Sequence, residues 1–334
     1  MIDKSGTEAF RPRDGVTPVA GRAGRARPFR PRESGASMAG RPDPALEELR
    51  REVDRLDGAI VELLAERLRV VREIARIKSA RDPGPAIRPG REAMILRRLV
   101  ARSAGRVPTA TLVRMWRELL AATTRAQAPL RLAAHVPPDG MVLWDLARDH
   151  FGSTAPIERV PTAQQTLRLL AEREADLAIL PFVGTQMHWW PQLADDANLP
   201  LRVVAALPFA TIGPDGVRPQ AFVVGAVAPE RSGDDLSLYA LETPDERDLD
   251  RLLADLRTSG TSARRLAFSP TSDRGQGLHL VAIEGFQLPD QGPLAAALAR
   301  PDSRVLRRAW VGGYARPLAV GDAAEAIQRS EGSK

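Results

Sequence analysis

The sequence predicts a multidomain protein with an all-α helical domain, an α/β lobe and a small α+β domain, in that order. Three observations support this fold class. Apolar residues recur at steps of three and four up to about residue 127, as they do in packed helices. From Leu130 onward, short β-like runs alternate with helical stretches. After Ser232-Gly233-Asp234-Asp235, four such runs and two helices follow in the order β-α-β-β-α-β, which fits a ferredoxin-like domain.

The domain boundaries follow from these changes of pattern. Residues 1–43 are rich in Arg, Pro and Gly, so we expect a disordered basic tail there. The helical domain is expected over residues 44–128 and the α/β lobe over 129–232. The α+β domain is expected over 233–320, and residues 321–334 are expected to form a second tail.

Composition and charge favour a protein that handles small molecules. The net charge is +6, and residues 1–40 hold eight basic against four acidic residues, so the rest of the chain is nearly balanced. There is no cysteine, and the four histidines lack ligand spacing, so we expect no metal site. We find neither an apolar run of about 20 residues nor a signal peptide. We therefore expect a cytoplasmic protein without membrane or nucleic-acid partners.

The first helix is expected to begin with Pro44 in its first turn and to run to about residue 80, where Asp82-Pro83-Gly84-Pro85 stops it. At 1.5 Å per residue its ~36 residues span about 54 Å, roughly twice the usual length within one domain. Shorter helices are expected over residues 90–103 and 109–127, and they cannot cover such a long apolar seam. We therefore expect a homodimer in which two long helices share a core. The seam consists of Leu46, Leu49, Val53, Leu56, Ile60, Leu63, Val70, Ile74 and Ile77, and the third helix is expected to turn Leu112, Met115, Trp116, Leu119 and Leu120 inward.

Arg67 interrupts this seam, because it occupies the position that the apolar rhythm requires between Leu63 and Val70. An arginine is rarely buried without an anionic partner. Arg67 therefore either pairs with an internal carboxylate or binds an anionic ligand. The flanking cations Arg50 and Lys78 favour the ligand.

Further polar residues fall near the same predicted core. Lys78 follows Arg67 by eleven residues, about three turns, and so lies on the same face of the helix. Arg50 precedes Arg67 by ~25 Å along the axis, so we expect it to reach the site of a partner chain. Thr123 and Gln127 continue the apolar stripe of the third helix at i, i+4 spacing. Each residue taken singly also fits a solvated helix surface.

The sequence over about residues 45–127 resembles the all-helical class of chorismate mutase. The resemblance is carried by the residues from Leu49 to Asp57, then Leu63-Leu64-Ala65-Glu66-Arg67, Ile77-Lys78, Arg91-Glu92 and Gln127. It implies an intertwined helical dimer that converts chorismate to prephenate without cofactor, metal or nucleophile, by holding the reactive conformer and stabilising the ether oxygen.

The resemblance also implies a role for each matched residue. Arg67 and the partner chain's Arg50 would bind the two carboxylates, since guanidinium bonds carboxylate in bidentate fashion. Lys78 and Gln127 would donate to the ether oxygen, and Glu92 would hold the ring hydroxyl. Thr123 stands where the family often has serine and keeps the hydroxyl. One departure matters: Arg88 replaces a usual aspartate, although it remains a candidate substrate-binding residue.

Beyond the helical domain, strands and helices are expected from the alternation of short apolar runs and amphipathic stretches. The expected strands are residues 130–135, 177–181, 201–206, 221–227, 236–241, 263–268, 278–283 and 305–311, and the expected helices are residues 142–151, 163–174, 247–258 and 293–298.

The same region resembles the prephenate dehydratase and ACT domains that follow this mutase in bifunctional proteins. The resemblance rests on the run from Ala175 to Pro181, on the run from Gln220 to Gly225, and on Gly312-Gly313-Tyr314. Gln220-Ala221-Phe222 stands where dehydratases need Thr-Arg-Phe, and the lobe lacks most of a second half. We therefore expect a degenerate lobe without dehydratase activity and an ACT-like domain without the usual amino-acid-binding motifs.

Two other functions stay open on the sequence alone. The chain fits a regulatory pseudoenzyme whose C-terminal half binds a partner enzyme or an amino acid. A basic helical nucleic-acid binder is the third reading. The pair Trp189-Trp190 fits an interaction surface and a core equally well.

Overall fold

The computed structural model describes residues 43–79, 87–138, 140–183, 188–195, 201–212, 219–271 and 276–320. The expected disordered tails therefore lie outside the described residues, apart from Asp43 at the start of the first helix. The chain divides into two compact parts, residues 1–61 and 62–334, and the boundary falls inside that helix. No helix of the described residues is long and apolar enough to cross a membrane.

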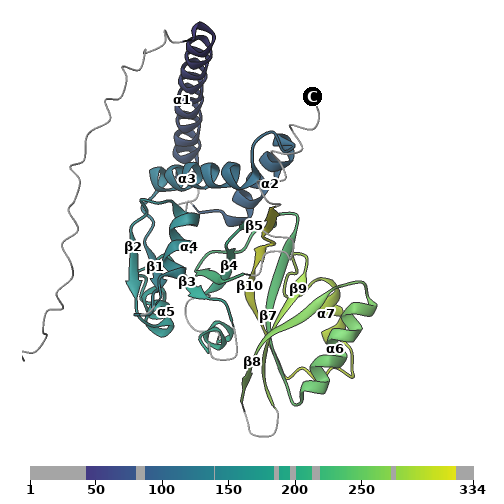
Figure 1. The fold of residues 1–334 in the computed structure, drawn as a ribbon. Coiled ribbons are helices and arrows are strands. Elements are labelled where there is room, and N and C mark those ends of the chain that lie inside the picture. Colours follow the sequence, from purple (N-terminus) through teal and green to yellow (C-terminus); the bar gives the residue numbers. More distant parts are fainter. Residues whose placement is uncertain are drawn as a thin grey trace, which may run out of the picture. The chain divides into compact units, whose positions relative to one another are not determined.

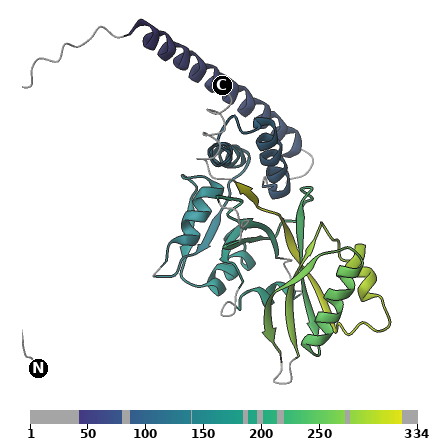
Figure 2. The same ribbon diagram turned by 45° about the vertical axis from the view of Figure 1, so that its right-hand side comes forward.

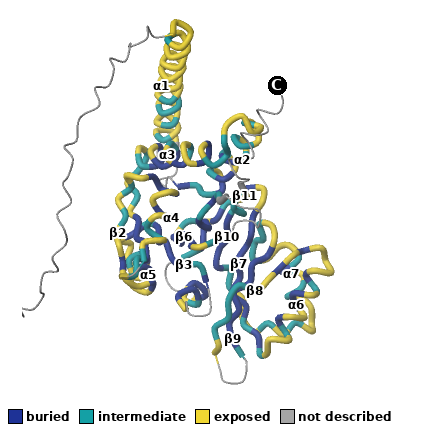
Figure 3. Tube along the Cα trace, in the orientation of Figure 1, coloured by how far each residue is buried: buried dark blue, intermediate teal, exposed yellow. Residues whose placement is uncertain are grey.

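The first helix, α1, spans Pro44–Ser79, as the apolar rhythm predicted. Asp43 begins it: its carboxylate accepts a hydrogen bond from the amide of Ala45 at 3.0 Å, and Pro44 follows where a missing N–H costs nothing. The apolar seam is exposed in the single chain, and α1 is largely yellow in Figure 3. The exposed fractions run from 41% at Ile74 to 65% at Leu49 and Leu63.

The other two helices of the region also lie where the sequence predicted them. Helix α2 spans Pro89–Ser103 and helix α3 spans Thr109–Gln127 (Figure 1). The expected inward face of α3 is partly wrong, because Met115 is 49% exposed. Its buried side chains are Leu112, Val113, Arg117, Leu120, Ala121, Thr123 and Thr124.

Helices α2 and α3 do not form a separate core. Leu96 of α2 and Val113 and Leu120 of α3 cluster with Phe209, just before strand β5 (Ala210–Ile212). Strand β11 (Leu318–Val320) pairs in parallel with β5 and adds Leu318 to this cluster. The two helices therefore share their apolar contacts with the strands of the C-terminal region.

Arg97 of α2 also ties the helices to the rest of the chain. Its guanidinium donates to the carbonyl oxygens of Ser232, Asp234 and Arg316 and to the Ser232 hydroxyl, at 2.8–3.0 Å. A guanidinium offers five donors in a rigid fork, so it holds several carbonyls together.

The α/β lobe is built around three parallel strands, of which β1 and β3 are covered on both faces and β2 is a largely exposed edge strand. Leu132, Ala134, Leu177 and Ile179 pack with α4, whereas the alternate residues of the same strands pack with α5. Strand residues point alternately to opposite faces, so such doubly covered strands are apolar throughout. The elements are β1 (Leu132–His135), α4 (Val142–Phe151), β2 (Ile157–Val160), α5 (Ala163–Ala171) and β3 (Leu177–Pro181).

The last region has the predicted β-α-β-β-α-β order. Its sheet runs β10-β7-β9-β8, and all three pairings are antiparallel. Helices α6 and α7 lie together beside this sheet in both ribbon views (Figures 1 and 2). The elements are β7 (Asp235–Thr243), α6 (Glu246–Thr258), β8 (Ala263–Pro270), β9 (Gly277–Glu284), α7 (Gly292–Leu298) and β10 (Arg307–Ala315).

The sequence did not predict that these two regions share one sheet. Nine strands run in the order β2-β1-β3-β6-β4-β10-β7-β9-β8. The link is the parallel pairing of β10 with β4 (Arg202–Leu207) at Gly312 and Val203, while β6 (Ala221–Gly225) pairs with the other side of β4. The strands β2, β5 and β11 were also not predicted.

Trp189 and Trp190 are core residues, which decides between the two readings of this pair. Both side chains are 1% exposed, and the short 3-10 helix Trp190–Ala194 carries the second. The indole N–H of Trp189 donates to the Pro181 carbonyl at 3.1 Å.

Candidate functional site

Arg67 has no hydrogen-bond or ion-pair partner among the described residues, although its side chain is partly buried on α1. Burial without a compensating anion lowers the pKa of its guanidinium. Of the two readings of Arg67, an internal ion pair is therefore wrong for the described residues of the single chain. The second reading, an anionic ligand, stays a prediction.

The other two predicted cations of α1 differ from Arg67. Arg50 is exposed and pairs with Glu47 one turn earlier, at 2.5 Å. Exposed pairs of this kind contribute little and open readily. Lys78 lies in the last turn of α1, and its side chain is outside the described residues.

Thr123 and Gln127 lie one turn apart on α3, as their spacing predicted. The Thr123 hydroxyl donates to the carbonyls of Leu119 and Leu120 at 3.0 and 2.9 Å. The Gln127 side-chain amide donates to the Thr123 carbonyl at 3.1 Å. Both polar groups are thus bonded within their own helix.

Glu92 lies in a buried ion pair that the sequence did not predict. Its carboxylate accepts a hydrogen bond from Nη1 of Arg117 at 2.9 Å, and both side chains are largely buried. Nη1 also lies 3.5 Å from Nε2 of His150 on α4. Burial raises the pKa of Glu92 against the opposing effect of the Arg117 charge.

Arg88 likewise has a structural partner. It precedes α2, and its guanidinium donates to the Glu230 carboxylate at 2.7 and 2.8 Å. Of the seven predicted site residues, only Thr123 and Gln127 are joined by a hydrogen bond between described residues. Among the described residues of the single chain, Arg67 forms no hydrogen bond with Glu92 or with Gln127.

His150 is buried beside Arg117, and this gives a testable pH dependence. Burial, together with the Arg117 charge, lowers the pKa of His150 well below 6.5. As the pH falls below 6.5, the unfolded chain therefore binds a proton that the folded chain excludes, and the free energy of unfolding decreases. The slope from this group reaches up to about 1.4 kcal/mol per pH unit.

We expect His150→Gln to flatten the decrease in the free energy of unfolding between pH 7 and pH 5, measured by urea titrations. The control is His188→Gln, at an exposed histidine, which should keep the wild-type slope. Superimposable pH profiles of wild type and His150→Gln would contradict the assignment.

The segment Gln220-Ala221-Phe222, which aligns with the dehydratase Thr-Arg-Phe motif, lies mostly in the hydrophobic core. Ala221 and Phe222 are fully buried in β6, and Gln220 is exposed. The Phe222 ring packs against Phe182 at 4.9 Å and against Tyr314 at 5.5 Å between centroids. Aromatic side chains therefore surround Phe222, the residue that keeps the phenylalanine of the motif.

Comparisons with known proteins bear on these regions separately. Residues 49–128, which hold most of α1 and all of α2 and α3, match the model of the family described as chorismate mutase type II. The bifunctional chorismate mutase/prephenate dehydratase of Stutzerimonas stutzeri is 28% identical over 140 residues, which are 41% of this chain and 38% of that protein. The protein of the same description from Neisseria gonorrhoeae is 30% identical over 132 residues, 40% of this chain and 35% of that protein.

The matched region thus spans less than two fifths of these relatives' own length. Among solved structures, prephenate dehydratase from Streptococcus mutans is similar at 14% identity, with a TM-score of 0.42. That match covers 58% of this chain and all of the solved chain.

Proposed function

We propose that this protein is a chorismate mutase, an isomerase that rearranges chorismate to prephenate in aromatic amino-acid biosynthesis. The proposal rests on Arg67: a partly buried guanidinium without a partner among the described residues, within the 80 residues that match the mutase family. The matched relatives are named for the same activity.

The proposed chemistry needs no cofactor. Arg67 and Arg50 from a second chain bind the two carboxylates of chorismate, and Lys78 and Gln127 donate to the ether oxygen as charge develops there. Gln127 must turn away from the Thr123 carbonyl to do so, at the cost of one neutral hydrogen bond, about 1 kcal/mol. Thr123 lies beside Gln127 and is proposed to position it.

Glu92 and Arg88 fit the proposed site less directly, because both have partners in the single chain. The proposed contact of Glu92 with the ring hydroxyl requires the Arg117 pair to open or the hydroxyl to approach the outer carboxylate oxygen. Arg88 is proposed to contribute through its backbone, since its guanidinium is held by Glu230.

We expect Arg67→Ala to lower kcat/KM for chorismate at least a thousandfold, which is about 4 kcal/mol of transition-state stabilisation. The loss of absorbance of chorismate measures it, and prephenate is the expected product, without phenylpyruvate above the spontaneous rate. The free energy of unfolding should change little, because Arg67 has no carboxylate partner among the described residues that the substitution would leave unpaired.

Arg69→Ala is the matched control, since Arg69 is an exposed arginine of the same helix. It should keep kcat/KM within about twofold, because exposed charges outside a site interact weakly. The proposal is wrong if the purified wild-type dimer does not consume chorismate. An Arg67→Ala variant that is active but poorly folded would instead give Arg67 a structural role.

The proposed assembly is a homodimer, because the apolar seam of α1 is exposed in the single chain. In such a dimer, inactive Arg50→Ala and Arg67→Ala subunits should complement each other. Each heterodimer has one site with both arginines, so a mixture at equilibrium should regain about a quarter of wild-type activity. Subunit exchange is checked by native mass spectrometry with one labelled chain. Exchange without regained activity would place Arg50 outside the site.

The regulatory alternative has less support. It predicts an interaction or effector response that depends on the C-terminal region. The cytoplasmic location stays a prediction from the sequence.

A further inference from the structure

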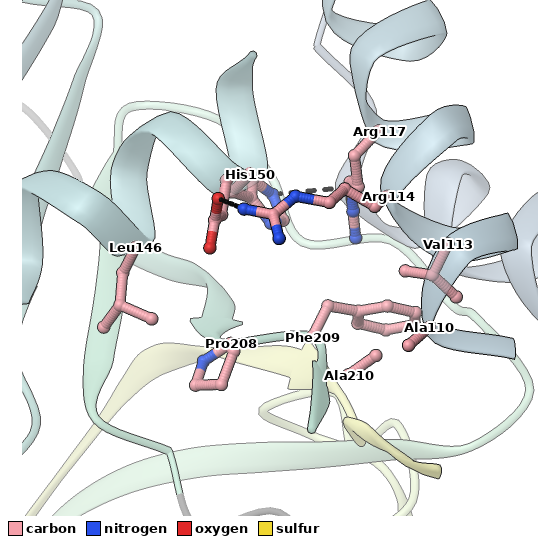
Figure 4. Close-up of a pocket in the computed structure, with 10 residues that line it drawn as sticks. Ala110, Val113, Arg114, Arg117, Leu146, His150, Pro208, Phe209 and Ala210 are labelled. Atoms are coloured by element: carbon pink, nitrogen blue, oxygen red, sulfur yellow. Dashed lines mark hydrogen bonds and ion pairs between the residues drawn. The ribbon is translucent and has the colours of Figure 1, made fainter. Parts of the chain in front are cut away.

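A cavity of about 210 Å³ lies between α3, α4 and the connection from β4 to β5 (Figure 4). One buried water needs only about 10–15 Å³ of such space, so the cavity has room for a small organic molecule. Neither the mutase proposal nor the comparisons assign anything to it.

Most of the cavity wall is apolar. Val113 of α3 and Leu146 of α4 face it from two sides, and Pro208 and Phe209 close a third. Phe209 is only 6% exposed, so its ring is fixed by the packing around it. A flat or compact apolar group of a ligand would contact apolar side chains on these three sides.

A buried guanidinium with unused donors faces the same space. Arg117 is 5% exposed, and its carbon Cζ lies 4.9 Å from the centre of the Phe209 ring. Only its Nη1 has hydrogen-bond contacts among the described residues, with Glu92 and His150. Nε and Nη2 are therefore available to an acceptor that enters the cavity, and a carboxylate matches their fork.

A second arginine stands at the rim of the cavity. Arg114 precedes Arg117 by three residues, lines the cavity and pairs with Asp149 at 2.5 Å. His150 is neutral near pH 7, as its lowered pKa requires. Asp149 and Glu92 balance the charges of Arg114 and Arg117, so the attraction for an anion comes from the unused guanidinium donors of Arg117 and not from a net positive charge.

We propose that this cavity binds a small monoanionic carboxylate with an apolar body. The carboxylate accepts hydrogen bonds from Arg117 and Arg114, and the body lies against Phe209 and Val113. The two unused donors of Arg117 match a single carboxylate group, and the apolar wall disfavours fully polar anions. The cavity lining contains neither Arg67 nor Gln127, and its one link to the proposed mutase residues among the described contacts is the ion pair of Arg117 with Glu92.

Titration calorimetry of the full-length protein with benzoate and with benzamide tests the proposal. The two probes share a ring and differ in the charge of the head group. We expect benzoate to bind at least about tenfold more tightly than benzamide, as charged hydrogen bonds to a partly buried guanidinium require. Equal affinities, or no binding of benzoate at 10 mM (roughly the weakest affinity of interest), would overturn the proposal.

Two variants locate the binding. Arg114→Gln should weaken benzoate about fivefold and leave benzamide unchanged. Arg98→Gln, at an exposed arginine of α2 outside the cavity lining, should leave both affinities unchanged. Ala110→Leu fills the cavity from the first turn of α3 and should remove binding of both probes, with folding checked by thermal unfolding. Benzoate binding that survives both Arg114→Gln and Ala110→Leu would refute this site.

Discussion

Replacing Arg117 by methionine is expected to lower the free energy of unfolding by about 3–5 kcal/mol. The substitution removes a largely buried cation and leaves the Glu92 carboxylate, 14% exposed, without its partner. A buried charge that loses its partner is far more costly than a pair that is absent altogether. Urea unfolding followed by circular dichroism at neutral pH measures the effect.

The double variant Glu92→Leu with Arg117→Met should recover most of this loss, because two apolar side chains replace the ion pair. The matched control is Arg114→Met, one turn earlier on α3, whose pair with Asp149 is 73% and 55% exposed. Its cost should stay below about 1 kcal/mol. Similar losses from Arg114→Met and Arg117→Met, or a double variant no more stable than Arg117→Met, would contradict the account.

Gly312→Ala is expected to destabilise the protein by about 4 kcal/mol, through backbone strain and a steric clash together. Gly312 has φ +122°, and a Cβ there would lie 2.2 Å from the Val203 carbonyl oxygen and 2.6 Å from its nitrogen. Both clashing atoms are backbone, so no side-chain rotation relieves them. Thermal unfolding by calorimetry or circular dichroism measures the loss.

Gly260→Ala separates strain from clash. Gly260 follows α6 with φ +80°, and a Cβ there would meet nothing within 4 Å. Its cost should be only about 1 kcal/mol, from the backbone alone. If Gly312→Ala costs no more than Gly260→Ala, the close approach of β10 to β4 is not important for stability.

The local elements were predictable because each carries its own periodicity. The bounds of α2 and α4 agree with the pattern to within one residue, and β3 has both predicted ends. The strands β2 and β5 were missed because four and three residues carry too little alternation. The single nine-stranded sheet was not predicted, because Gly312 in the sequence does not show that its backbone will approach Val203 of β4.

The candidate site was predictable only in part, because a local pattern reveals an unusual residue but not the distant residue that it contacts. Arg67 was found because an arginine breaks an apolar rhythm. The same signal existed for Arg117, which lies in helical register with Val113, Leu120 and Thr124, all buried. Its partner Glu92 is 25 residues away, and no local pattern shows that two charges on different helices will meet.

The pairing of β10 with β4 has a consequence for synthesis on the ribosome. One edge of β4 can pair with β6 soon after both are synthesised. The other edge can pair only after β10 is synthesised, about a hundred residues later. At 5–20 residues per second that edge stays open for roughly 5–20 seconds. During this interval β4, whose side chains are mostly apolar, presents unpaired backbone amide and carbonyl groups to neighbouring nascent chains. Ribosomes that stall before residue 307 would release polypeptides prone to aggregate through this strand.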